Sequence, residues 1–210
     1  MTKTEKEFDV TDPANLRSSD AVTSYTYAST HKMLSNETTT TSEGKSISTH
    51  YTYPFDVQDP ALKIMWDKED PNYRHMQGIQ VKVETYQGTG SPMLIAGTKN
   101  NYFVSPTHQL LLDNIQVAGT NGVYETRIDF QQYDPNGNLL QVRKSHDLPT
   151  SYLWSYNAAL PVAQILNAES GQGYYEGFEH HPSGQNNRSE AHSGHKYLTG
   201  SFTIPFAIPD

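Results

Sequence analysis

Histidines near the end of the chain have the spacing that comes closest to a metal site. His192 and His195 are three residues apart, so two imidazoles could bind one zinc ion, and His180 and His181 precede them. A stable zinc site needs rigid ligands, but these histidines lie among Gly, Ser and Asn residues, and the chain has no cysteine. We therefore expect no metal or other cofactor, and His192 and His195 are the nearest zinc candidates.

No set of side chains has the pattern of a known catalytic site. Ser, His and Asp all occur, but the Gly-x-Ser-x-Gly turn of many hydrolases does not. Gly88-Thr89-Gly90 lacks the spacing and the following lysine of a phosphate-binding loop, and indicates a hairpin turn. Any two acids at a suitable separation could serve a glycosidase, and no pair stands out. We predict a non-catalytic protein with no catalytic residues.

Aromatic residues offer a different chemistry, because an exposed ring can stack on a sugar. Tyr174 and Tyr175 are adjacent, and Tyr152, Trp154 and Tyr156 alternate with smaller side chains. Tyr174 and Tyr175 are therefore candidate ligand-stacking residues. Alternating rings more often form the buried face of a sheet, and this is the expectation for residues 152–156.

Composition narrows the class of protein and of partner. The chain has 14 Tyr, 7 Phe and 2 Trp in a hydrophobic fraction of only 35%, which is typical of tyrosine-rich β proteins rather than disordered ones. A net charge of -8 with scattered Lys and Arg makes nucleic acid an unfavourable partner. No apolar stretch has the length of a membrane span and no export signal is visible, so we expect no membrane insertion.

The elements that must position these residues are mainly short strands. Residues 1–20 are polar and predict a flexible arm. Asp59 followed by Pro60 predicts the start of one short helix, with Asp as the N-cap. Alternating or β-branched residues predict strands in the ranges 79–85, 94–98, 102–105, 110–117, 124–130 and 150–156.

The turn Asp134-Pro135-Asn136-Gly137 determines the register of the best-defined hairpin. A two-residue loop centred on Asn136-Gly137 would place Phe130 opposite Arg143 and turn Val142 to the wrong face. A type I turn with Pro135 and Asn136 in the middle and Gly137 left-handed instead pairs Phe130 with Val142. We predict this second register, since a slip of one residue inverts every side chain.

The same turn carries a resemblance to a known family. Tyr133-Asp134-Pro135-Asn136-Gly137-Asn138-Leu139-Leu140 resembles the YD repeat, in which Tyr-Asp is followed by residues including Gly, then by Asn or Arg and Leu. Residues 151–157 and 160–165 resemble the terminal segment of YD-repeat (Rhs-like) regions in large surface or secreted proteins of the Bacteroides and Flavobacterium type. The resemblance covers residues 123–168. It implies strands that add one after another to a sheet.

A second resemblance begins at Gly173. Residues 174–179 and the Ala-His-Ser-Gly segment at 191–194 are similar to the opening strands of carbohydrate-binding jelly rolls. By similarity to such modules, Glu176 and Glu179 are the candidate calcium ligands, and the alternative is a solvated turn without a metal. A sandwich needs about seven or eight strands, so residues 169–210 would be only the start of such a module.

These inferences predict a mainly β chain with three parts. They are a flexible arm at 1–20, a YD-repeat-like region of serial antiparallel hairpins with one short helix at 21–168, and an incomplete β-sandwich-like module at 169–210. The function expected is a non-catalytic structural or interaction scaffold of a secreted or cell-surface bacterial protein. Its partners would be polysaccharide or other domains of the same protein. The alternatives are a carbohydrate-binding module in the C-terminal segment and part of an Rhs-type shell that encloses a toxin.

Overall fold

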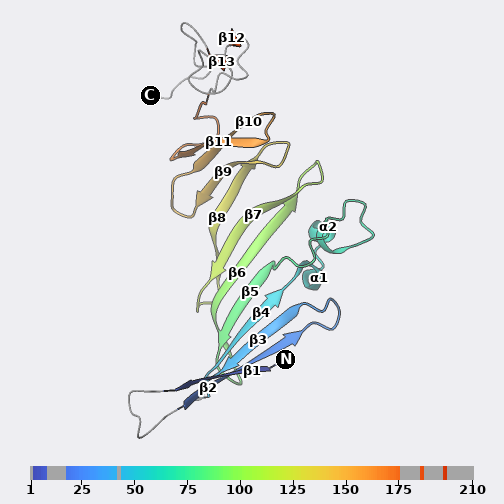
Figure 1. Cartoon of the computed structure of the whole chain (residues 1–210), viewed down its shortest axis with the longest axis vertical. Coiled ribbons are helices and arrows are strands. Elements are labelled where there is room, and N and C mark those ends of the chain that lie inside the picture. Colours follow the sequence, from blue (N-terminus) through green and yellow to red (C-terminus); the bar gives the residue numbers. More distant parts are fainter. Residues whose placement is uncertain (1, 9–17, 42–43, 176–184, 187–195, 198–210) are drawn as a thin grey trace. The chain divides into compact units, whose positions relative to one another are not determined.

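Eleven strands form one antiparallel sheet whose order follows the chain (Figure 1). The computed structural model describes residues 2–8, 18–41, 44–175, 185–186 and 196–197. Each strand from β2 to β10 has its predecessor on one side and its successor on the other, as expected when hairpins follow one another. The predicted mainly β fold of serial antiparallel hairpins is therefore confirmed.

The strands of this sheet are, in order, β1 (Thr2–Phe8), β2 (Ser18–Tyr27), β3 (Leu34–Thr40), β4 (Ser46–Thr52), β5 (Lys82–Gln87), β6 (Met93–Val104), β7 (Leu110–Ala118), β8 (Tyr124–Tyr133), β9 (Leu139–Lys144), β10 (Thr150–Ser155) and β11 (Leu160–Leu166). Two further short strands, β12 (Gln185–Asn186) and β13 (Lys196–Tyr197), pair with each other in a separate sheet. The chain divides into two compact units, residues 1–129 and 130–210, so the boundary falls within β8.

The beginning of the chain differs from the expected arm. Thr2–Phe8 forms β1, which pairs with β2 from Thr2 opposite Ser24 to Phe8 opposite Ser18. The polar composition that predicts an arm is compatible with an edge strand, because hydrogen bonds between backbones need no apolar side chain. Residues 9–17 lie outside the described part of the chain.

Some predicted strand boundaries also shift. The two candidates at 94–98 and 102–105 are parts of one strand, β6, whose pairing with β7 slips between Asn101 and Tyr102. The candidate at 79–85 begins later, at Lys82, because Val81 bonds to Thr52 before the regular ladder starts (N···O 2.9 Å). A β-bulge keeps a strand paired across a local irregularity that a sequence pattern shows as a break.

A helical insertion separates β4 from β5. It contains α1 (Pro54–Val57), the 3₁₀ helix η1 (Pro60–Leu62) and α2 (Lys63–Trp66). Asp59 caps η1 as predicted, since its carboxylate accepts from the Ala61 N–H at 2.9 Å. The short helix α1 was not predicted.

The largest buried apolar cluster of the first unit lies in this insertion. Leu62, Ile64, Met65 and Val81 form it, and Met65 is fully buried. Half-buried side chains of the sheet pack against the cluster, namely Tyr102 and Val104 of β6 and Leu110 of β7. The insertion therefore covers part of one face of the sheet.

The aromatic face expected for residues 152–156 is not a buried core. Tyr152 and Trp154 are half-buried, and Tyr156 is 43% exposed. Tyr156 also lies beyond β10, where the chain takes a left-handed conformation (φ 55°). The Trp154 indole N–H donates to the Leu139 carbonyl at 2.9 Å, so this ring spans to the neighbouring strand.

Candidate functional site

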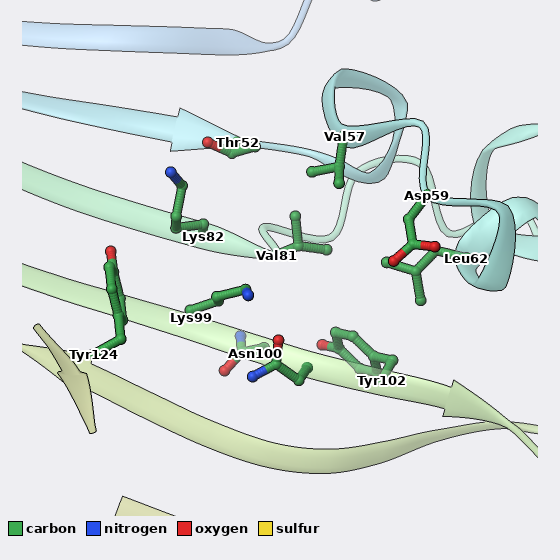
Figure 2. Close-up of a pocket in the computed structure, with 11 residues that line it drawn as sticks. Thr52, Val57, Asp59, Leu62, Val81, Lys82, Lys99, Asn100, Tyr102 and Tyr124 are labelled. Carbon is green, nitrogen blue, oxygen red and sulfur yellow. The ribbon is translucent and has the colours of Figure 1, made fainter. Parts of the chain in front are cut away.

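A cavity of about 390 Å³ lies in the first unit between the helical insertion and the sheet (Figure 2). Its apolar wall comes from Val57 of α1, Leu62 of η1 and Val81. Polar and aromatic side chains complete the lining: Thr52, Asp59, Lys82, Lys99, Asn100, Asn101, Tyr102 and Tyr124. This volume falls within the range of small-molecule sites, roughly 300–1,000 Å³.

Backbone hydrogen bonds hold the insertion against the sheet at this point. The Val81 N–H donates to the Thr52 carbonyl at 2.9 Å, and the Asn100 N–H donates to the Val81 carbonyl at 2.8 Å. Val81 is thus fixed between β4 and β6 before β5 begins. The Val81 part of the apolar wall is therefore anchored by the sheet itself.

The bulge in β6 brings consecutive residues to the cavity. In a regular strand, successive side chains point to opposite faces. The pairing with β7 slips between Asn101 and Tyr102, and both residues line the cavity together with Asn100. Bulges commonly redirect side chains beside functional sites.

Two lysines occupy directly opposite positions on the strands that form the floor of the cavity. Lys82 of β5 is the direct antiparallel partner of Lys99 of β6. Figure 2 shows their side chains extending from neighbouring strands, with Asp59 on the helical side. Like charges directly opposite each other are unfavourable in a sheet. Lys82 has a compensating partner in Glu84, at 2.9 Å, whereas Lys99 has no ion pair within the described residues.

A row of four residues across the sheet supports this floor. Glu84, Gly97, Ala118 and Tyr124 are successive partners on β5, β6, β7 and β8. The Tyr124 hydroxyl reaches across the two small residues and donates to Glu84 Oε1 at 2.9 Å. A larger residue at Gly97 or Ala118 would obstruct this contact.

Protonation in this row follows from burial and hydrogen bonding. Burial alone would raise the pKa of Glu84, but hydrogen bonds from Lys82 and Tyr124 outweigh it and hold that pKa below its usual value. Burial and the bond to Glu84 raise the pKa of Tyr124 well above its usual value. The carboxylate is therefore ionised and the phenol protonated at neutral pH.

Several polar side-chain atoms of the lining have no hydrogen-bond partner within the described residues. Asn100 Nδ2 donates to the Gln80 carbonyl (3.3 Å) and Asn101 Nδ2 to Asn114 Oδ1 (2.8 Å), and neither Oδ1 has a partner in the described part of the chain. The same holds for the Tyr102 hydroxyl, whose pKa burial raises, so that it remains a donor at neutral pH.

A second cavity, of about 380 Å³, lies at the turn between β7 and β8. Its lining includes Arg127 and Glu125, which pair with each other at 3.2 Å. The opposite charges of this cavity are thus already matched, whereas Lys99 in the first cavity is not.

The predicted turn at 134–137 has the expected geometry. Gly137 has a φ of 86°, its N–H donates to the Asp134 carbonyl at 3.0 Å, and the Asp134 N–H donates to the Asn138 carbonyl at 2.9 Å. These are the bonds of a type I turn followed by a left-handed residue. The side chains of Gln131 and Gln141 bond at 2.6 Å, as they should when Phe130 and Val142 face each other.

Asp134 and Asn138 have roles in this turn that the spacing alone did not predict. The Asp134 carboxylate accepts from the N–H groups of Asn136 (2.9 Å) and Asn138 (2.8 Å) and from Asn138 Nδ2 (3.0 Å). Asn138 Nδ2 also donates to the Ala158 carbonyl at 2.7 Å, in the loop between β10 and β11. The motif residue Asn138 therefore connects one hairpin to the next.

The candidate stacking residues follow β11 in the second unit. Tyr174 is 36% exposed and Tyr175 is 46% exposed. The preceding residue, Gly173, packs so closely on Ile165 that an added Cβ would overlap it. Tyr174 and Tyr175 thus extend from a point where the backbone lies directly on β11.

The candidate metal ligands Glu176, Glu179, His192 and His195 lie outside the described residues, as do His180 and His181. Within the described residues, no three His, Cys, Asp or Glu side chains are grouped as a metal site. No helix in that part of the chain is both long and apolar enough to cross a membrane.

No protein-family model matches the chain, and a search of curated proteins finds no match.

Proposed function

We propose that this chain is a structural scaffold segment of a secreted or cell-surface bacterial protein related to the YD-repeat family. The observation that carries the proposal is the hydrogen bond from Asn138 Nδ2 to the Ala158 carbonyl. It joins the turn of the YD-like octet to the loop of the following hairpin. A motif side chain used in this way serves to add hairpins to a sheet.

The arrangement of the strands supports the same role. Hairpins that pair in chain order build a sheet by repetition, and each new hairpin needs only its predecessor as a template. Among the described strands, β11 has one neighbour, and its Leu160 and Leu166 are 53% and 67% exposed. Such an edge can accept a further strand.

The structural part of the proposal is tested by amide hydrogen exchange on the purified chain. In an Asn138→Ala variant, residues 150–166 should lose protection, because the link to Ala158 is removed. Asn136→Ala is a matched control in the same turn, since the Asn136 side chain is exposed. Equal protection of β10 and β11 in both variants would contradict the proposed link.

The cellular part is tested by locating the protein in its source bacterium. Antibodies raised against the chain should detect it on intact cells or in the culture medium. Recovery in the cytosolic fraction alone would refute a surface or secreted scaffold.

Polysaccharide binding is a second candidate function, favoured by the exposure of the adjacent Tyr174 and Tyr175. Affinity electrophoresis in polysaccharide gels should show retardation that Tyr174→Ala or Tyr175→Ala abolishes. Tyr27→Ala is the control, because Tyr27 is also exposed, at 52%, and lies in β2. Equal loss of retardation in all three variants would argue against a site at these two tyrosines.

A further inference from the structure

We propose that the cavity between the helical insertion and β5–β6 binds a sugar acid, with the carboxylate of the ligand beside Lys99 and its hydroxyl groups on the amides and Tyr102. The ligand would be a free uronic acid or the terminal residue of an acidic polysaccharide. This inference does not rest on the scaffold proposal, because it concerns only residues of the first unit.

The lysine pair supplies the argument for an anion. Lys82 and Lys99 are direct cross-strand partners, and Glu84 compensates only Lys82, at 2.9 Å. Lys99 is exposed and has no carboxylate beside it within the described residues. An anion beside Lys99 would form a charge-assisted hydrogen bond, which is stronger than a neutral one.

The open polar atoms supply the argument for hydroxyl groups. Asn100 Oδ1 and Asn101 Oδ1 can accept, and the protonated Tyr102 hydroxyl can donate and accept. Across the cavity, the Asp59 carboxylate uses one oxygen, Oδ1, for the Ala61 N–H, which leaves Oδ2 as a further acceptor. A sugar hydroxyl both donates and accepts, so it complements this mixed set better than an apolar acid does.

The apolar wall supplies the argument for a ring. Val57, Leu62 and Val81 form one side of the cavity. A sugar ring presents C–H groups on its faces and hydroxyls at its edge, so it can contact such a wall while its hydroxyls meet polar side chains. An inorganic anion would contact the lysines but not this wall. An amino-acid zwitterion could pair with Lys99 and Asp59 but would leave the amide oxygens of Asn100 and Asn101 without hydroxyl donors.

The test is a titration of the full chain followed by amide NMR with glucuronate, glucose and glycine as probes. Glucuronate should shift the amide signals of Asn100, Asn101 and Tyr102 and bind about tenfold more tightly than glucose, because one charge-assisted bond is added. High salt should weaken glucuronate binding and leave glucose binding unchanged, since only the charged pair is screened.

Variants identify the groups responsible. Lys99→Gln should reduce glucuronate affinity about tenfold to that of glucose, whereas Lys99→Arg should retain the preference. Lys68→Gln is the matched control, because Lys68 is exposed and does not line the cavity. Tyr102→Phe should weaken both sugars, which tests the hydroxyl contact separately from the charge.

Three results would overturn the proposal. They are glucuronate binding no tighter than glucose or glycine, an affinity that Lys99→Gln leaves unchanged, and the absence of shifts at the cavity residues. None of these results bears on the exchange protection of β10 and β11, so the scaffold proposal stands or fails independently.

Discussion

Replacing Gly97 with alanine should destabilise the first unit through a single contact. A Cβ added at Gly97 would lie 2.5 Å from the Tyr124 hydroxyl oxygen and 3.0 Å from its Cζ. Ordinary contacts begin near 3.4 Å, so the hydroxyl must retreat by 3.4 − 2.5 = 0.9 Å. The bond from Tyr124 to Glu84 is 2.9 Å long, and a movement of that size breaks it.

The size of the effect follows from this loss. A hydrogen bond to a charged group contributes about 1.5–3 kcal/mol, and a Gly→Ala change returns about 0.4–1 kcal/mol by restricting the unfolded chain. The free energy of unfolding should therefore fall by about 1–2 kcal/mol. Gly119→Ala is the matched control, because an added Cβ there meets nothing within 4 Å. That variant should be neutral or slightly stabilised.

A double-mutant cycle measured by urea unfolding isolates the contact. In a Tyr124→Phe background the hydroxyl is absent, and the nearest remaining ring atom is Cζ at 3.0 Å. Gly97→Ala should then cost less than about 0.5 kcal/mol, giving a coupling energy near 1 kcal/mol. An equal cost in both backgrounds, or a Gly97→Ala variant as stable as Gly119→Ala, would refute the reasoning.

Three further changes test the second unit. Burial alone would raise the pKa of Asp134, but hydrogen bonds from Asn138 and Asn136 lower it. The ionised carboxylate therefore stabilises the fold above about pH 4, and this contribution is lost as the pH falls through the folded pKa. In urea unfolding, the Asp134→Asn variant should lose less stability on acidification than the unmodified chain. Gly137→Val should lower the free energy of unfolding by more than about 1 kcal/mol, because a β-branched residue resists a φ of 86°, and an unchanged melting temperature would contradict the turn. Ala158→Gly should raise the melting temperature, since relief of left-handed strain, about 1–2 kcal/mol, exceeds the added freedom of the unfolded glycine, about 0.5–1 kcal/mol; a lower melting temperature would contradict this.

Local chemistry accounts for the features that were predictable from sequence. The turn at Gly137 and the helix start at Asp59 each depend on residues within four positions of one another. Proline, glycine and capping side chains determine such geometry without help from the rest of the fold. The serial order of most hairpins was likewise predictable, because a short turn leaves a strand only its predecessor as a partner; the pairing of β4 with β5 across the insertion is the exception.

Features that depend on distant residues were not predictable. The strand Thr2–Phe8 has the polar composition of an arm, and only its pairing with β2 makes it a strand. The rings of Tyr152 and Trp154 alternate as a core face does, yet alternation shows which side chains share a face and not whether anything covers that face.

The cavity belongs to this second class. Asp59 and Lys99 are forty positions apart in the chain; Asp59 is recognisable there only as a helix cap, and Lys99 lies in no motif. They line one cavity because the insertion after β4 packs against β6 and because β6 bulges at Asn101. In the sequence, the cavity is indicated only by two lysines in strands. Their proximity becomes apparent only when the register of β5 and β6 pairs Lys82 with Lys99.

The helical insertion interrupts the series of hairpins between β4 and β5, and this explains why the cavity lies there. A sheet built from hairpins in chain order offers no covering layer of its own, so an enclosed site requires a segment that leaves the sheet and returns to it. The insertion does so between Thr52 and Lys82 and holds most of the buried apolar side chains described in the first unit. Because Leu62 and Val81 belong both to that buried cluster and to the cavity wall, the packing that stabilises the insertion also shapes the site. Ligand binding at Lys99 should therefore stabilise the insertion by RT ln(1 + [L]/Kd), an amount that keeps rising with ligand concentration after the site is full.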